Sequence, residues 1–246
     1  MGFIEKGLEI LYPSNIHCLF CGSAIDNTRP YALCDTCMEK FHWLGDKTCG
    51  KCGKLLPDDY RHDLCYDCRA FPRAFEKGYT CVQYGLYERG LMMDYKYRGK
   101  SYIGRKLGDI LYDRMALENF HADYIVPVPM HEKKQQKRGY NQAAIMAKRL
   151  ARRMEAVYIG NLLARCRETK PMKGLGSFER QENLRGAFAV QRGNRYAITG
   201  KDILLVDDIY TTGSTMDQCS KILLEAGANQ VFALSFAAGA NLPPRA

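Results

Sequence analysis

The chain has 246 residues, of which 46% are hydrophobic and 26% are charged, and its formal net charge is +9. These proportions are typical of folded soluble proteins and exclude a disordered chain, and no run of about 18 apolar residues suggests a transmembrane helix. The charge is unevenly distributed, because residues 1–75 carry a net charge of −1 and the remainder carries +10. A basic surface on the second part of the chain suits phosphate groups, whether on a small molecule or on nucleic acid.

The opening segment, residues 2–13 (GFIEKGLEILYP), is amphipathic. Glu5, Lys6 and Glu9 interrupt it where a signal peptide needs an unbroken apolar run. We therefore expect a cytoplasmic protein. In that reducing compartment, closely spaced cysteines bind metal ions rather than form disulfides.

Residues 18–68 contain eight of the eleven cysteines, arranged as four Cys-x-x-Cys pairs. Two pairs separated by twelve residues form a unit that occurs twice. Each pair can turn both sulfurs toward one ion, and a second pair completes a tetrahedron. Gly22 and Gly53 follow the leading pairs, where a tight turn with positive φ is needed. The sequence predicts two metal sites made by Cys18, Cys21, Cys34, Cys37, Cys49, Cys52, Cys65 and Cys68.

Zinc is the expected metal because it is available and has no ligand-field preference, although four thiolates also hold a single iron. Four sulfur ligands leave no position for a catalytic water, so we expect both ions to be structural. Sequential pairing within each unit and cross-braced pairing both fit the spacing. We expect residues 1–75 to form a small cysteine-rich module that folds around its metal ions, and residues 76–246 to form a second domain.

The second domain shows strands that alternate with helices. We expect a β-rich segment at 78–87, a helical stretch over 88–115 and a short apolar strand at 124–129. Further helices are predicted at 140–155 and 213–226, and further strands at 186–191, 202–206 and 230–237. This order predicts an α/β fold, a mainly parallel sheet flanked by helices, with its ligand site at the carboxyl ends of the strands.

The most informative segment is ILLVDDIYTTGSTM, residues 203–216. An apolar strand runs into Asp207 and Asp208, and a loop of small residues then leads into a helix. The Thr211–Thr215 loop places hydroxyls and free backbone N–H groups at a helix N-terminus, where phosphate binds. The two carboxylates can accept hydrogen bonds from sugar hydroxyls. An acidic turn with a Ser/Thr helix cap explains each feature singly, but their combination favours ligand binding.

This segment resembles the phosphoribosyl pyrophosphate signature of type I phosphoribosyltransferases. Three further segments, residues 94–111, 124–151 and 162–190, extend the similarity, and the chain as a whole resembles the ComF family of competence-associated proteins. The resemblance implies a type I phosphoribosyltransferase-like domain preceded by a double zinc ribbon. It also implies phosphoribosyl pyrophosphate and Mg²⁺ as ligands, and a link to DNA uptake or recombination in natural transformation.

The same resemblance implies a role for individual residues. Asp207 and Asp208 would bind the ribose hydroxyls, and the 5-phosphate would lie on Thr211, Thr212, Gly213, Ser214 and Thr215. The pyrophosphate loop would be Val128, Pro129 and Met130, and residues 165–178 a flexible loop. That loop lacks the Thr-x-x-Gln pattern common in the family, so Lys170 and Lys173 are the residues that could supply charge to pyrophosphate.

The sequence leaves three functions open. A Mg²⁺-dependent transferase would displace pyrophosphate from ribose C1 with a nitrogen nucleophile, but neither an acceptor site nor a general base is evident. The alternative is a non-catalytic protein that binds single-stranded DNA, since basic residues alternate with tyrosines over 95–102. An amphipathic helix with buried tyrosines explains the same pattern. A competence helicase that docks on the zinc ribbons is a third expectation, from the resemblance alone. The expected DNA contacts are Lys96, Arg98, Lys100 and Arg138.

Overall fold

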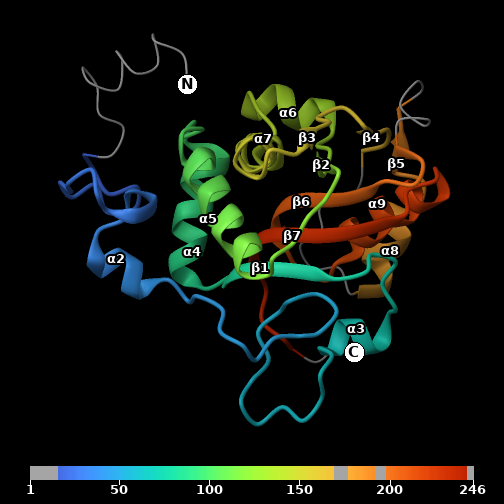
Figure 1. Cartoon of the computed structure of the whole chain (residues 1–246), viewed down its shortest axis with the longest axis horizontal. Helices are drawn as coiled ribbons and strands as arrows, with labels where there is room; N and C mark the ends of the chain where they lie inside the picture. Colours follow the sequence, from blue (N-terminus) through green and yellow to red (C-terminus); the bar gives the residue numbers. More distant parts are fainter. Residues whose placement is uncertain (1–15, 169–176, 192–197, 243–246) are drawn as a thin grey trace.

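The computed structural model describes residues 16–168, 177–191 and 198–242. Its centre is a five-stranded sheet with the order β1-β7-β6-β2-β3, in which every neighbouring pair is parallel (Figure 1). The expected α/β fold with a mainly parallel sheet is confirmed. The strands are β1 (Gly78–Gln83), β2 (Tyr124–Pro127), β3 (Val157–Tyr158), β6 (Asp202–Tyr210) and β7 (Gln230–Ala238).

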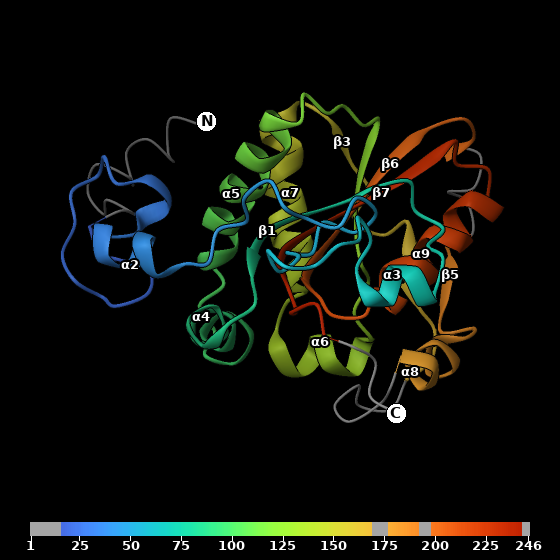
Figure 2. The ribbon, with the colours of Figure 1, turned by 90° about the horizontal axis from the view of Figure 1, so that it is seen from below.

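Helices cover both faces of this sheet, so β6 is buried on both sides (Figure 2). Leu204 and Val206 pack into the core that α5 and α7 share, whereas Ile203 and Leu205 pack into the core on the side of α9. A strand buried on both faces has a continuous apolar run, as the sequence shows here. The helices are α4 (Leu86–Tyr97), α5 (Ile103–Leu117), α7 (Gln142–Met154), α8 (Ser177–Leu184) and α9 (Ser214–Glu225).

A small antiparallel pair lies beside α9. It consists of β4 (Leu163–Arg165) and β5 (Phe188–Val190), which are joined in the chain by the segment that contains α8. Arg165 and Phe188 are register partners in this pair. The pair therefore brings a basic residue to the side of the sheet on which α9 packs.

Two expectations for the second domain need correction. The helical stretch expected over 88–115 is two helices, because α4 ends at Tyr97 and Gly99 adopts a φ of +68 before α5 begins. The strand expected at 202–206 continues to Tyr210, since it pairs with β7 as far as Ala238. Asp207 and Asp208 therefore belong to β6 rather than to the turn after it. The segment after β2 contains a short helix, α6 (Glu132–Arg138).

The cysteine-rich region contains only short helical elements among its described residues: η1 (Pro30–Ala32), α2 (Asp35–Lys40) and α3 (Tyr66–Ala70). Its first half lies beside α4 and α5 (Figures 1 and 2). The cysteines of its second half belong to the core on the α9 side of the sheet. Within the described ranges, no helix is long and apolar enough to cross a bilayer.

Candidate functional site

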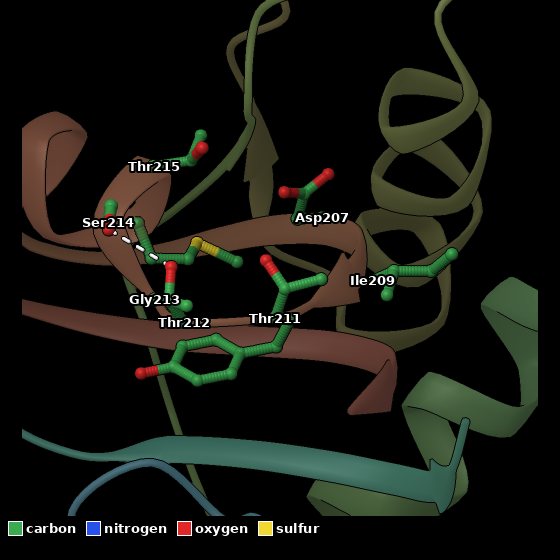
Figure 3. Close-up of a pocket in the computed structure, with 9 residues that line it drawn as sticks. Asp207, Ile209, Thr211, Thr212, Gly213, Ser214 and Thr215 are labelled. Carbon is green, nitrogen blue, oxygen red and sulfur yellow. Dashed lines mark hydrogen bonds between the residues drawn. The ribbon is translucent and has the colours of Figure 1, made fainter. Parts of the chain in front are cut away.

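A pocket lies at the carboxyl end of β6 and the start of α9 (Figure 3). Parallel α/β sheets bind their ligands at this edge. The pocket contains Asp207 and the whole of the loop to which the sequence assigned the 5-phosphate. Its lining residues are Asp207, Ile209, Tyr210, Thr211, Thr212, Gly213, Ser214, Thr215 and Met216.

The shape of this loop depends on Gly213, whose φ of +81 lies in the left-handed region that other residues avoid. A Cβ at this position would overlap the hydroxyl of Tyr210. Ser214 is the first residue of α9, and its Oγ lies 3.0 Å from Oγ1 of Thr212 (Figure 3). The loop therefore presents hydroxyls and the unpaired N–H groups of the first helical turn at the pocket.

Asp207 is the acidic group of the pocket. Its Oδ1 accepts a hydrogen bond from the backbone N–H of Asp208 at 2.8 Å. Burial of the carboxyl, together with the like charge of Asp208, raises the pKa of Asp207 to about 7. This carboxyl changes its charge near neutral pH, which is a property typical of functional sites.

Asp208 forms an ion pair with Lys96 of α4 instead of lining the pocket. Lys96 Nζ lies 2.7 Å from Asp208 Oδ2, and the two side chains are only 17% and 13% exposed. A partly buried pair of this kind is screened little by salt, so Lys96 fixes the position of Asp208. The two aspartates that the sequence assigned to the ribose thus have different surroundings.

The expected pyrophosphate loop follows β2, next to the end of β6. Val128 is buried, and its N–H donates to the carbonyl of Val206 at 2.8 Å. The Asn141 side chain donates to the carbonyl of Val128 at 3.0 Å and also caps α7. Pro129 and Met130 are half-buried. The three residues lie beside the β6 edge but outside the lining of the pocket.

The eight cysteines form two tetrads, Cys18/Cys21/Cys34/Cys37 and Cys49/Cys52/Cys65/Cys68, in each of which all sulfurs lie within 4.8 Å of one another. The pairing is therefore sequential within each repeat, and the cross-braced alternative is wrong. Gly22 and Gly53 have φ values of +76 and +73, as the tight turns require. Four converging thiols in this arrangement fit structural zinc.

The cysteine tetrads differ in burial. All four cysteines of the second tetrad are buried, whereas Cys21 of the first is exposed and Cys34 is half-buried. Backbone N–H groups donate to sulfur in both, from Cys34 to Cys18 at 3.4 Å and from Cys65 to Cys49 at 3.2 Å. Such hydrogen bonds stabilise thiolates around a metal ion.

Comparison with known proteins gives the same two-part organisation. A family model of the double zinc ribbon domain matches residues 7–69, and one of the phosphoribosyl transferase domain matches residues 136–242. The chain is 27% identical over 224 residues to "Competence protein F" of Haemophilus influenzae, covering 88% of this chain and 94% of that protein. It is 28% identical over 211 residues to "DNA utilization protein YhgH" of Escherichia coli, with coverages of 82% and 88%. "Competence protein ComFC" of Streptococcus pneumoniae is 24% identical over 229 residues, with coverages of 87% and 96%. Over most of its length the chain is similar to ComF-type competence proteins.

Further cations lie near the site. Burial, with the neighbouring charges of Arg165 and Arg138, lowers the pKa of Lys134. Burial also lowers the pKa of Arg165, whose guanidinium interacts electrostatically with Asp207. The sequence analysis did not identify Lys134 or Arg165. The four-residue spacing of Lys134 and Arg138 on α6 was a signal for a shared helix face.

The residues expected to contact DNA already have partners within the chain. Lys96 is paired with Asp208, whereas Arg98 and Lys100 both bind Asp94, at 2.9 and 2.6 Å. Arg138 donates to the hydroxyl of Tyr97 at 3.0 Å and lies over its ring. Tyr95 is buried, whereas Tyr97 and Tyr102 are exposed.

Lys170 and Lys173, which the resemblance assigned to pyrophosphate, lie outside the described residues. His131, which follows the pyrophosphate loop, caps α6 by accepting a hydrogen bond from the N–H of Lys133 at 3.3 Å.

Proposed function

We propose that this ComF-type protein binds phosphoribosyl pyrophosphate with Mg²⁺ in the pocket after β6, and that it serves DNA uptake or recombination during natural transformation. The observation that carries the proposal is the Thr211–Thr215 loop at the start of α9, beside the carboxyl of Asp207. A phosphate on this loop gains backbone N–H donors and the positive end of the helix dipole.

The residues around the pocket support one orientation of the ligand. With the 5-phosphate on the loop, Asp207 is the acceptor for a ribose hydroxyl, and Asp208 becomes a second acceptor if Lys96 releases it. The pyrophosphate then extends toward Val128–Met130 and the cations of α6 and β4. When bound, Mg²⁺ would supply Lewis acidity and help to orient the ligand.

The role in transformation rests on the relatives. Two of them are named competence proteins and one a DNA utilization protein, and each matches over most of its length. The alternative is a single-stranded DNA-binding protein that retains the pocket. The internal pairing of Lys96, Arg98 and Lys100 disfavours those side chains as the DNA contacts, so we place ligand binding first.

Calorimetric titration of the metal-loaded protein with phosphoribosyl pyrophosphate and Mg²⁺ tests the proposal. We expect saturable binding by the wild type, at least tenfold weaker binding by Asp207→Asn, and none by the Asp207→Asn/Asp208→Asn double variant. Asp202→Asn is the matched control, because Asp202 lies at the opposite end of β6 and accepts from Asn229. We expect its affinity to equal that of the wild type.

Absence of binding by the wild type, or equal binding by all variants, would contradict the proposal. Adding labelled single-stranded oligonucleotide at two salt concentrations tests the alternative in the same experiment. Affinity for the oligonucleotide that falls with salt, without any affinity for phosphoribosyl pyrophosphate, would favour the DNA-binding protein.

A further inference from the structure

Arg73 connects the second cysteine tetrad to the pocket loop. Its side chain is buried at 7% exposure, and its Nη2 donates both to the carbonyl of Thr212 at 2.6 Å and to the carbonyl of Asp67 at 3.3 Å. Thr212 lines the pocket, and Asp67 precedes the metal-site residue Cys68 on α3. One guanidinium group therefore joins two segments that are far apart in the sequence.

The charge of this guanidinium needs compensation, because an isolated buried charge is strongly unfavourable. Cys68 and Asp217 interact with it electrostatically. Nε and Nη1 of Arg73 are buried without a nitrogen or oxygen hydrogen-bond partner among the described residues. Thiolates of the Cys49/Cys52/Cys65/Cys68 tetrad supply the negative charge that balances such a cation, and N–H···S hydrogen bonds to metal-bound thiolates are a common outer-shell interaction.

Contacts around Arg73 strengthen the same connection. The N–H of Ala74 donates to Oδ1 of Asp217, a buried residue in the first turn of α9, at 2.8 Å. Phe75 packs edge-on against the ring of Tyr210, and Nζ of Lys54 lies 5.8 Å from the centroid of the same ring. Tyr210 in turn leaves no space for a Cβ at Gly213. The segment that follows the second tetrad thus supports the loop, Tyr210 and the start of α9.

The first tetrad is connected to a different part of the molecule. The hydroxyl of Tyr87 donates to Cys37 Sγ at 2.8 Å, and the ring of Tyr87 stacks on Phe20 at 3.8 Å. Tyr87 belongs to α4, so these contacts lead to that helix and away from the start of α9.

We propose that Arg73 is a positioning residue that holds the Thr211–Thr215 loop in its binding conformation and couples that loop to the second cysteine tetrad. The part that concerns ligand affinity rests on the proposed binding of phosphoribosyl pyrophosphate. The part that concerns the loop stands without it, because the hydrogen bonds of Arg73 to Thr212 and Asp67 do not involve the ligand.

Arg73→Met tests this coupling in the full-length, metal-loaded protein, because methionine keeps much of the apolar volume and removes all five donors. Arg114→Met is the matched control. Arg114 also donates to a backbone carbonyl, that of Thr80 at 3.3 Å, and its side chain is 22% exposed, but it lies on α5. Three quantities are compared: hydrogen exchange of amides 211–216, zinc content, and the dissociation constant for phosphoribosyl pyrophosphate with Mg²⁺.

We expect Arg73→Met to accelerate exchange at 211–216 at least tenfold and to weaken ligand binding at least tenfold, with Arg114→Met close to wild type in both. If amides 211–216 exchange at the same rate in Arg73→Met as in Arg114→Met, the inference is overturned. If the wild type fails to bind the ligand, the proposed function fails, while the exchange comparison still decides the role of Arg73.

Arg73→Lys keeps the positive charge but replaces the planar guanidinium, which reaches both carbonyls, by a compact ammonium group. It replaces Arg73→Met in the comparison if the methionine variant does not fold. We then expect faster exchange at 211–216 with both zinc ions retained. Unchanged exchange in a folded lysine variant would overturn the inference as well.

Discussion

Adjacent aspartates on β6 show how strongly surroundings set the behaviour of a side chain. Asp208 has a lysine partner at 2.7 Å, whereas Asp207 is buried beside the charge of Asp208 and has a pKa of about 7. Sequence gives both residues the same role, because it shows their order but not the helix that brings Lys96 to one of them. Only the folded arrangement distinguishes a paired carboxylate from one that titrates near neutrality.

The raised pKa of Asp207 predicts a pH-dependent stability. Between its ordinary value of 3.8 and about 7, the folded protein holds a proton that the unfolded chain has lost, so this group makes the protein less stable as pH rises through that window. Asp207→Asn does not titrate. We therefore expect its stability relative to wild type to increase between about pH 5 and about pH 8, as measured by urea unfolding. A difference that is the same at both pH values would contradict the assignment.

The loop between β6 and α9 depends on a glycine for its shape. Gly213 is required twice, once by its φ of +81 and once by the hydroxyl of Tyr210, where a Cβ would lie. Gly99, between α4 and α5, has a φ of +68 but open space around it. Substituting Gly99 therefore tests backbone strain alone, whereas substituting Gly213 adds steric overlap with Tyr210.

Gly99→Ala should lower the free energy of unfolding by roughly 1–2 kcal/mol, the cost of the left-handed conformation for an L-residue. Gly213→Ala should cost more, because the tyrosine must also move, and it should reduce the affinity for phosphoribosyl pyrophosphate. Denaturant midpoints and calorimetric titration of both variants check this. Equal losses of stability with unchanged affinity would show that the loop tolerates the displacement.

The sequence predicted most of the elements, and it placed the Thr211–Thr215 loop at the start of a helix, for a physical reason. Continuous apolar runs identified β6 and β7, and the Thr211–Thr215 loop is a local motif whose hydroxyls and helix start are adjacent in the chain. The break between α4 and α5 was missed because a single glycine at 99 can be accommodated within a helix. Lys96, Arg165 and Arg73 reach the pocket region only through tertiary packing, and no local pattern assigns them to it.

At the scale of the molecule, the two cysteine tetrads occupy different environments. The first lies against α4 at the periphery, with Cys21 exposed, and the second belongs to the core that also contains Tyr210 and Met216. Metal ligands that are shielded from solvent exchange slowly with competing chelators, because the protein must open before the chelator can attack.

We therefore expect zinc release to a chromogenic chelator to occur in two phases of equal amplitude. Cys21→Ser should abolish the fast phase by removing a ligand from the exposed site, while the slow phase persists. Cys166→Ser is the control, because Cys166 is also exposed but belongs to neither tetrad. A single phase in the wild type, or loss of the slow phase in Cys21→Ser, would contradict the difference in burial.

The sheet order has a consequence for biosynthesis. β1 leaves the ribosome long before β7, yet β7 lies between β1 and β6 in the finished sheet. The nascent polypeptide can load metal on its cysteines early, and residues 42–44 can already hydrogen-bond to one edge of β1. The other edge of β1 has no strand partner until translation has passed residue 238. A product that stops before residue 230 would carry an unsatisfied strand edge, which is a target for chaperones and proteases.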